Sequence, residues 1–142
     1  MLTDQRETVS PASDRSRMSA LIVDDEAHVR VYLRLILRSL GVTKVWEAGD
    51  GAEGLQSYAD HRPDVVLLDV NMPVLSGEGL IEGLARRFPE AAVIIVTSQS
   101  EHQAVKRFAE LGAIGYVLKQ QPPEAVTRMI ADALDLLDVD AA

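Results

Sequence analysis

Polar side chains that could carry chemistry follow four short apolar runs of this sequence. They comprise two adjacent carboxylates, a third carboxylate, a hydroxyl and an ammonium group: Asp24, Asp25, Asp69, Thr97 and Lys119. Each one alone has an ordinary interpretation, as a helix cap, a turn residue or a solvated charge. Together they predict a site, because ligands of an open parallel sheet bind outside the carboxyl ends of its strands.

The chemistry expected of these residues follows from their charge. Three carboxylates held close together repel one another, and a hard divalent cation removes that conflict. Mg²⁺ suits such a site, since it takes oxygen ligands and needs only one or two carboxylates plus a phosphate oxygen. An incoming phosphoryl group can then be shared between the metal and Lys119 while one carboxylate attacks phosphorus. We therefore expect Mg²⁺-dependent phosphoryl transfer to an aspartate, which forms an acyl phosphate.

The elements that must position these residues alternate along the chain. Apolar residues at helical spacing, such as Val29, Leu33, Ile36 and Leu40, alternate with short apolar runs typical of buried strands. Five such strand–helix pairs predict an α/β fold with a parallel sheet, right-handed crossovers and helices on both faces. The expected strands are Ala20–Val23, Thr43–Glu47, Asp64–Leu68, Ala91–Val96 and Tyr116–Leu118. The expected helices are Val29–Leu40, Ala52–Asp60, Leu80–Phe88, Ala104–Leu111 and Val126–Leu137.

Composition excludes several classes of function. With 14 basic and 22 acidic residues, the 142-residue chain carries a net charge of −8, which repels phosphate backbones and argues against direct nucleic acid binding. The absence of cysteine from the sequence excludes disulfides, thiolate catalysis and cysteine zinc sites. The longest apolar run, Ala91–Val96, is far shorter than the roughly 20 residues of a membrane helix. We expect a soluble cytoplasmic protein without membrane contacts.

One domain is expected between two short tails. Residues 1–18 are polar, contain Pro11 and show no apolar period, so we expect them to form a disordered tail. The domain is expected over residues 19–138, with residues 139–142 as a C-terminal tail. Because the chain ends soon after the last expected helix, we expect a stand-alone domain without an attached output domain.

Four motifs surround the ends of the expected strands. They are LIVDDE at Leu21–Glu26, VLLDVNMP at Val66–Pro73, IVTS at Ile95–Ser98 and GYVLK at Gly115–Lys119. In this order and spacing they resemble the receiver domain of two-component response regulators, the CheY-like superfamily, over about Ser19–Leu137. The resemblance implies a doubly wound, flavodoxin-like fold, with a five-stranded parallel sheet in the order 2-1-3-4-5 and five helices.

The resemblance also implies how the acidic residues work. Asp69 would accept the phosphoryl group from a histidine kinase or a histidine phosphotransfer protein. Asp24 and Asp25 would bind Mg²⁺ together with Asp69, with Asp25 favoured as the direct ligand, and Asn71 would add its backbone carbonyl. The implied metal ligands are therefore Asp24, Asp25, Asp69 and Asn71.

Three further residues of the resemblance act on the phosphoryl group or respond to it. Thr97 would hydrogen-bond the group and Lys119 would pair with it, so that both join Asp69 as catalytic residues. Thr97 and Tyr116 would form a switch, in which the aromatic ring moves inward as Thr97 swings toward the phosphate. One position departs from the family, which has a proline after the lysine across a cis peptide, because Gln120 follows Lys119 here. A cis bond before a non-proline residue costs about 2.5–4 kcal/mol, so the loop either carries that strain or takes a different backbone path.

Three functions remain open at this point. The first is a receiver that signals to a downstream protein through its fourth helix, last strand and fifth helix, as a monomer or weak homodimer and not as a turnover enzyme. The second is a haloacid-dehalogenase-like Mg²⁺-dependent phosphatase. Such an enzyme requires a second aspartate as acid/base two residues after the nucleophile, where this sequence has Asn71. The third is a pseudo-receiver that binds partners without phosphorylation, and the intact carboxylate set argues against it.

Three arginines, Arg30, Arg34 and Arg38, recur at every fourth residue of the first expected helix, opposite its apolar stripe. A solvated helix face is the ordinary interpretation. The alternative is a docking face for the phosphodonor, since this helix flanks the site in the family that the sequence resembles.

Overall fold

Strands and helices alternate in the computed structural model, which describes residues 15–70, 77–98, 106, 109–110 and 112–141. The strands of this part of the chain are β1 (Ser19–Val23), β2 (Lys44–Ala48), β3 (Val65–Asp69), β4 (Val93–Thr97) and β5 (Ala113–Leu118). Its helices are α2 (Ala27–Ser39), α3 (Gly51–His61), α4 (Gly77–Arg87) and α6 (Pro123–Ala141). The alternation of strand and helix predicted by the hydrophobic pattern is confirmed.

The strands form one parallel sheet in the order β2-β1-β3-β4-β5, which confirms the predicted order. After β1 the chain first moves outward to β2 and then returns to β3, on the other side of β1. This reversal is the topological switch point of the sheet, and open parallel sheets bind ligands beyond the strand ends at such a point. The residues that follow β1 and β3 are therefore well placed to form a site.

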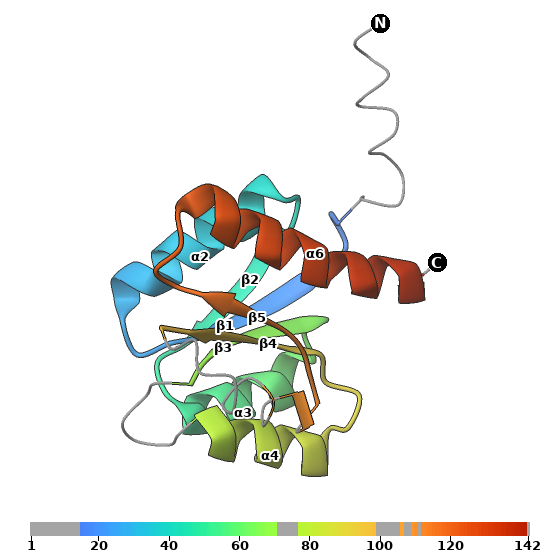
Figure 1. Cartoon of the computed structure of the whole chain (residues 1–142). Helices are drawn as coiled ribbons and strands as arrows, with labels where there is room; N and C mark the ends of the chain where they lie inside the picture. The colour runs from blue at the N-terminus through green and yellow to red at the C-terminus, as the bar shows by residue number, and fades with distance from the viewer. Residues whose placement is uncertain (1–14, 71–76, 99–105, 107–108, 111, 142) are drawn as a thin grey trace, which may run out of the picture.

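Helices cover both faces of the sheet (Figure 1). The pair α2 and α6 lies against one face, and the pair α3 and α4 lies against the other. Alternate residues of β1 contribute to the two layers: Ala20 and Ile22 belong to the core under α2 and α6, whereas Leu21 and Val23 belong to the core under α3 and α4. All four are fully buried. Burial on both faces explains why the central strands are continuously apolar.

A reciprocal cap fixes the loop from β2 into α3. The Asp50 carboxylate accepts a hydrogen bond from the Glu53 backbone N–H at 2.8 Å, and the Glu53 carboxylate accepts one from the Gly49 N–H at 2.6 Å. These bonds occupy N–H groups for which the first helical turn offers no partner. The helix accordingly begins at Gly51, one residue before the start that the sequence predicts.

The structure describes four helices, whereas the sequence predicts five. The helix predicted over Ala104–Leu111 lies mostly outside the described residues, and the three of its residues that are described, 106, 109 and 110, are helical. No described helix combines the length and the apolar character that crossing a membrane requires.

The last strand is longer than the sequence pattern predicts. The expected strand is Tyr116–Leu118, but β5 begins at Ala113. Gly115 interrupts the apolar run, yet strand pairing uses main-chain groups and does not require a side chain there. Ala113 pairs with Val93, and the register shifts between Val93 and Ile94.

The described residues before β1 pack on the domain. Arg15 is 7% exposed, its Nη1 donates to the Leu40 carbonyl oxygen at 3.2 Å, and its Nη2 pairs with Asp135 at 2.6 Å. The polarity of this segment predicts a tail up to Met18, because a charged residue is rarely buried. Hydrogen bonds to a helix end and a carboxylate satisfy the guanidinium, so Arg15 contacts the folded part, and Met18 packs against its core.

Candidate functional site

The Asp24 side chain is held at the carboxyl end of β1. Its backbone N–H donates to the Ala48 carbonyl oxygen at 3.1 Å, which extends the pairing with β2. Its Oδ1 accepts a hydrogen bond from the Glu26 N–H at 2.9 Å. Asp24 is fully buried, whereas Asp25 and Glu26 are exposed. The turn after β1 therefore offers one buried and one exposed aspartate.

Asp69 and Thr97 end two neighbouring strands. Asp69 is the last residue of β3, pairs in register with Val96 of β4 and is 2% exposed. Thr97 is the last residue of β4 and is 5% exposed. Its carbonyl oxygen accepts a hydrogen bond from the Lys119 N–H at 2.8 Å, which brings the residue after β5 to the same edge. Four parallel strands thus deliver these polar residues to one edge of the sheet.

The three aspartates form a compact acidic cluster. Carboxylate oxygens of Asp24, Asp25 and Asp69 lie within 4.8 Å of one another. Like charges at such distances repel each other strongly where water is scarce. The cluster therefore requires positive charge beside it.

Lys119 supplies part of that positive charge. Its Nζ lies 3.1 Å from Asp24 Oδ2 and 3.3 Å from Asp69 Oδ2, and its side chain is 18% exposed. Burial alone would lower the pKa of Lys119, but the two carboxylates outweigh burial and raise that pKa above the ordinary lysine value. The ammonium group is therefore charged at neutral pH.

One oxygen of the cluster is left without a hydrogen bond. Within the described part of the chain, the buried Asp24 Oδ2 accepts none, and its polar contact is the ion pair with Lys119. This oxygen therefore faces one cation, and a divalent cation at the cluster would give it a second positive partner. Exposure of Asp25 leaves the cluster open to the water that Mg²⁺ retains. The donor set of Asp24, Asp25 and Asp69 therefore fits Mg²⁺.

The backbone after Lys119 follows an ordinary path. No cis peptide bond occurs among the described residues, so the bond between Lys119 and Gln120 is trans. The Gln121 N–H donates to the Leu118 carbonyl oxygen at 3.3 Å in a turn that leads into α6. Of the two courses that the sequence leaves open for this loop, the structure takes the different backbone path. The ammonium still reaches both carboxylates.

The roles of two expected site residues stay predictions. Asn71 lies outside the described residues, so the metal contact of its carbonyl stays a prediction. Tyr116 of β5 pairs in register with Ile95 of β4 and is 43% exposed. Its switch role also stays a prediction, with the ring at the surface.

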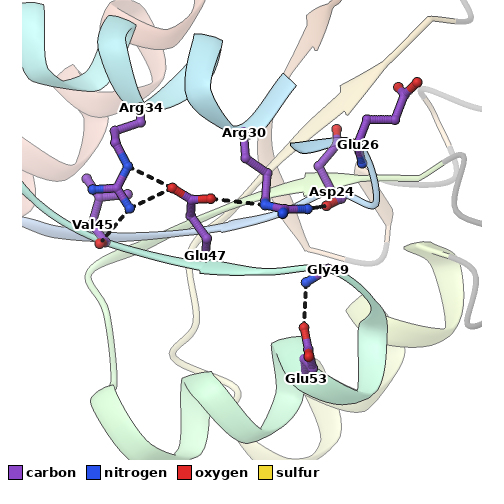
Figure 2. A network of polar contacts seen from close by, with 8 residues as sticks. All are labelled: Asp24, Glu26, Arg30, Arg34, Val45, Glu47, Gly49 and Glu53. Atoms are coloured by element: carbon purple, nitrogen blue, oxygen red, sulfur yellow. Dashed lines mark hydrogen bonds and ion pairs between the residues drawn. The ribbon is translucent and has the colours of Figure 1, made fainter. Parts of the chain in front are cut away.

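A polar network beside the site is not predicted by the sequence pattern (Figure 2). Arg30 and Arg34, whose spacing predicts a solvated or docking face, both pair with Glu47 of β2, at 3.0 and 2.6 Å. Arg30 also donates to the Asp24 backbone carbonyl oxygen at 2.6 Å. The sequence feature that could have indicated this network is the acidic residue Glu47 at the end of the expected strand Thr43–Glu47. Arg38, the third arginine of the series, is exposed.

Glu47 is held in its ionised form by this network. Burial alone would raise the pKa of Glu47, but hydrogen bonds from Arg34 and Arg30, and then their charges, outweigh it and lower the pKa below the ordinary glutamate value. Both arginines therefore face a full negative charge at neutral pH, which strengthens their hydrogen bonds.

Known proteins share this arrangement of sequence and fold. A family model described as "Response regulator receiver domain" matches residues 20–131, which include every residue of the acidic cluster. The chain is 37% identical over 126 residues to protein-glutamate methylesterase/protein-glutamine glutaminase 1 of Myxococcus xanthus, covering 87% of this chain and 36% of that protein. It is 29% identical over 110 residues to chemotaxis protein CheY of Thermotoga maritima, covering 78% of this chain and 92% of that protein.

The fold is likewise similar to solved structures. A chain of the CheX-CheY-BeF3-Mg²⁺ complex from Borrelia burgdorferi superimposes with a TM-score of 0.77 at 27% identity, covering 82% of this chain and 89% of that chain. Several curated relatives are longer: this chain spans 36% of the Myxococcus protein and 50% of the oxygen regulatory protein NreC of Staphylococcus epidermidis. The shared region is therefore one domain of proteins with different further parts.

Proposed function

The chain belongs to the receiver domain family of two-component response regulators, and from this premise we propose that it accepts a phosphoryl group on Asp69 in the presence of Mg²⁺. The donor is a histidine kinase or a histidine phosphotransfer protein. The proposal is carried by the joint position of Asp24, Asp25 and Asp69 within 4.8 Å, with the Lys119 ammonium 3.3 Å from Asp69. The backbone carbonyl of Asn71 completes the proposed metal ligands. The Borrelia complex, whose name includes Mg²⁺, supports the choice of ion.

Asp69 is the nucleophile of the proposed transfer. One carboxylate oxygen attacks phosphorus as the bond between phosphorus and the donor's imidazole nitrogen breaks, and the imidazole leaves with that electron pair and takes up a proton. Lys119 pairs with the negative charge of the phosphoryl group, and the Thr97 hydroxyl donates a hydrogen bond to it. Mg²⁺ bound at the acidic cluster supplies further positive charge. Most of the catalysis is thus positioning and charge neutralisation.

The domain acts in this proposal as a switch and not as a turnover enzyme. Water later attacks phosphorus, which releases inorganic phosphate and restores the Asp69 carboxylate. In the interval, contacts of Thr97 and Lys119 with the phosphoryl group bias a two-state equilibrium of β4 and β5. Tyr116, which is exposed on β5, is the aromatic residue proposed to turn inward in response. A downstream protein, in the cytoplasm, reads a surface that includes β5, α6 and the helix that the sequence predicts over Ala104–Leu111.

Labelling with a small phosphodonor tests the proposal. After incubation with acetyl phosphate and Mg²⁺, we expect intact mass measurement to show a phosphoryl adduct on the wild type. The adduct should be absent from Asp69→Asn and from wild type with chelated metal. Asp132→Asn removes an exposed aspartate of α6 and should be labelled like the wild type. An equal yield of adduct on Asp69→Asn would overturn the proposal, as would repeated turnover of a phosphomonoester without any adduct.

A further inference from the structure

Arg30 connects three elements around the acidic turn that follows β1 (Figure 2). It lies near the N-terminus of α2, its Nη1 donates to the Asp24 carbonyl oxygen at 2.6 Å, and its Nε donates to Glu47 of β2 at 3.0 Å. A cation near the N-terminus of a helix is electrostatically unfavourable, so these contacts and not the helix favour its place. We propose that Arg30 is a positioning residue of the metal site: by holding the Asp24 carbonyl it sets the direction of the Asp25 carboxylate. This inference rests on the Mg²⁺ site of the proposed function.

The peptide plane between Asp24 and Asp25 carries the effect. The Asp24 carbonyl and the Asp25 N–H lie in this one rigid plane, so the hydrogen bond from Arg30 fixes how the backbone enters Asp25. The Asp24 carboxylate has its own support, because its Oδ1 accepts from the Glu26 N–H. The exposed Asp25 carboxylate hydrogen-bonds no described residue. Its placement in the cluster therefore depends on the backbone of this turn, to which Arg30 contributes at the Asp24 carbonyl and the Glu26 N–H contributes at the Asp24 carboxylate.

Glu47 accepts hydrogen bonds from both Arg30 and Arg34. The two oxygens of Glu47 accept separately: Oε1 from Arg30 Nε at 3.0 Å and Oε2 from Arg34 Nε at 2.7 Å. Arg34 Nη2 also donates to the Val45 carbonyl oxygen at 3.4 Å, so Arg34 hydrogen-bonds β2 at two residues. The rigid fork of Arg30 can then span Glu47 and Asp24 at once, which a lysine ammonium cannot do in the same geometry.

The sign of the effect separates positioning from simple electrostatics. A positive charge near a Mg²⁺ site weakens metal binding by repulsion. If Arg30 acted only through its charge, a protein that lacks it would bind Mg²⁺ more tightly than the wild type. If Arg30 positions Asp25, a protein that lacks Arg30 would bind Mg²⁺ more weakly, because the Asp25 carboxylate loses its orientation. Arg34 offers a matched control, since it carries the same charge on the same helix and the same Glu47 partner but has no contact with Asp24.

Calorimetric titration with Mg²⁺ of Arg30→Met and Arg34→Met, in the full chain, tests the inference. Methionine keeps the length of the aliphatic stem and removes the charge in both variants. We expect Arg30→Met to raise the Mg²⁺ Kd about tenfold, as loss of a group that orients a ligand commonly does, and Arg34→Met to leave it within about twofold of that of the wild type. The Mg²⁺ concentration that gives half-maximal labelling by acetyl phosphate should rise by the same factor in Arg30→Met, with the rate at saturation nearly unchanged.

Each result decides the inference. An unchanged or lower Kd in Arg30→Met overturns it, and so does an equal rise in both variants, which would mean general loosening around Glu47. If Arg30→Met does not fold, Arg30→Lys replaces it: a raised Kd supports positioning and a wild-type Kd overturns it. Normal labelling together with equal Mg²⁺ Kd values in all variants contradicts the inference about Arg30 and leaves the proposed phosphoryl acceptance intact. If Arg30→Met alone loses Mg²⁺ affinity but no protein is labelled, wild type included, the result contradicts only the proposed phosphoryl acceptance.

Discussion

At the scale of single residues, one ammonium group lies between two buried carboxylates. Lys119 Nζ is 3.1 Å from Asp24 and 3.3 Å from Asp69, so it relieves the repulsion between them. The same ammonium occupies the region where the negative charge of a phosphoryl group would arrive. In the proposed function, Lys119 would therefore compete with the metal ion for the Asp24 carboxylate and would assist the ion at the phosphoryl group.

Replacement of Lys119 by methionine separates these two effects. We expect Lys119→Met to bind Mg²⁺ more tightly than the wild type, because a competing cation is gone. We also expect its labelling by acetyl phosphate to be about a hundredfold slower, because a charge that stabilises the transferring group is missing. Calorimetry and the labelling rate measure the two effects, with Lys44→Met, at an exposed position of β2, as the control. Weaker metal binding or labelling at the wild-type rate would refute this assignment.

The position of the site residues could be predicted from the sequence because all parallel strands end at the same edge of a sheet. Asp24, Asp69 and Thr97 each follow or end a short apolar run, and that rule needs no side-chain geometry. The reach of long side chains could not be predicted in the same way. The contact of Arg30 with the Asp24 carbonyl depends on how far a guanidinium extends from α2 toward the next strand, which the helical spacing does not encode.

At the scale of elements, ionised side chains join α2 to the edge strand β2. Glu47 accepts from Arg30 and Arg34, and these contacts lower its pKa even though burial opposes the shift. A carboxyl group with a lowered pKa in the folded state stabilises the fold above its unfolded pKa, which is about 4.3 for glutamate. That stabilisation disappears as the pH falls through the lower, folded-state pKa.

The pH dependence of unfolding tests this link between α2 and β2. We expect Glu47→Gln to lower the free energy of unfolding by about 1 kcal/mol at pH 7, the usual upper range for a partly exposed ion pair. The difference from the wild type should shrink as the pH falls below about 4. Urea titrations at several pH values measure it. Glu90→Gln breaks the exposed pair with Arg62 and should have a smaller effect, and a Glu47→Gln deficit that persists at low pH would speak against the assignment.

The elements of this fold follow from hydrophobic spacing, with exceptions that have physical causes. The central strands β1, β3 and β4 are apolar on both faces, so their positions are predictable from unbroken apolar runs in the sequence. The start of β5 is not, because Ala113 and Gly115 pair through the main chain and leave no apolar run. The contact of Arg15 is not predictable either, because its partners, Leu40 and Asp135, lie far away in the sequence.

At the scale of the whole molecule, the site and the fold are coupled because the proposed metal ligands belong to different strands. Asp24 follows β1 and Asp69 ends β3, and these two strands pair directly. An unfolded chain would not hold these carboxylates together. Any ion that binds the assembled cluster therefore stabilises the whole domain by mass action.

Added Mg²⁺ should raise the free energy of unfolding of the wild type by about 2.7 kcal/mol at 100 times its Kd. We expect Asp25→Asn to lose most of this gain, because it lacks one proposed ligand. Without metal, its stability should equal or exceed that of the wild type, because the neutral amide removes repulsion from the Asp24 and Asp69 carboxylates. Urea titrations with and without Mg²⁺ provide the comparison, and Asp132→Asn should keep the full gain. A gain in Asp25→Asn equal to that of the wild type would exclude Asp25 as a ligand.

The most direct test of the central claim locates the phosphoryl group after labelling with acetyl phosphate and Mg²⁺. Reduction with borohydride converts an aspartyl phosphate to homoserine, and peptide mass spectrometry then identifies the modified residue. The site described here predicts homoserine at position 69 and nowhere else, and only in samples that contained the metal. Modification at another residue, or at Asp69 without metal, would contradict it.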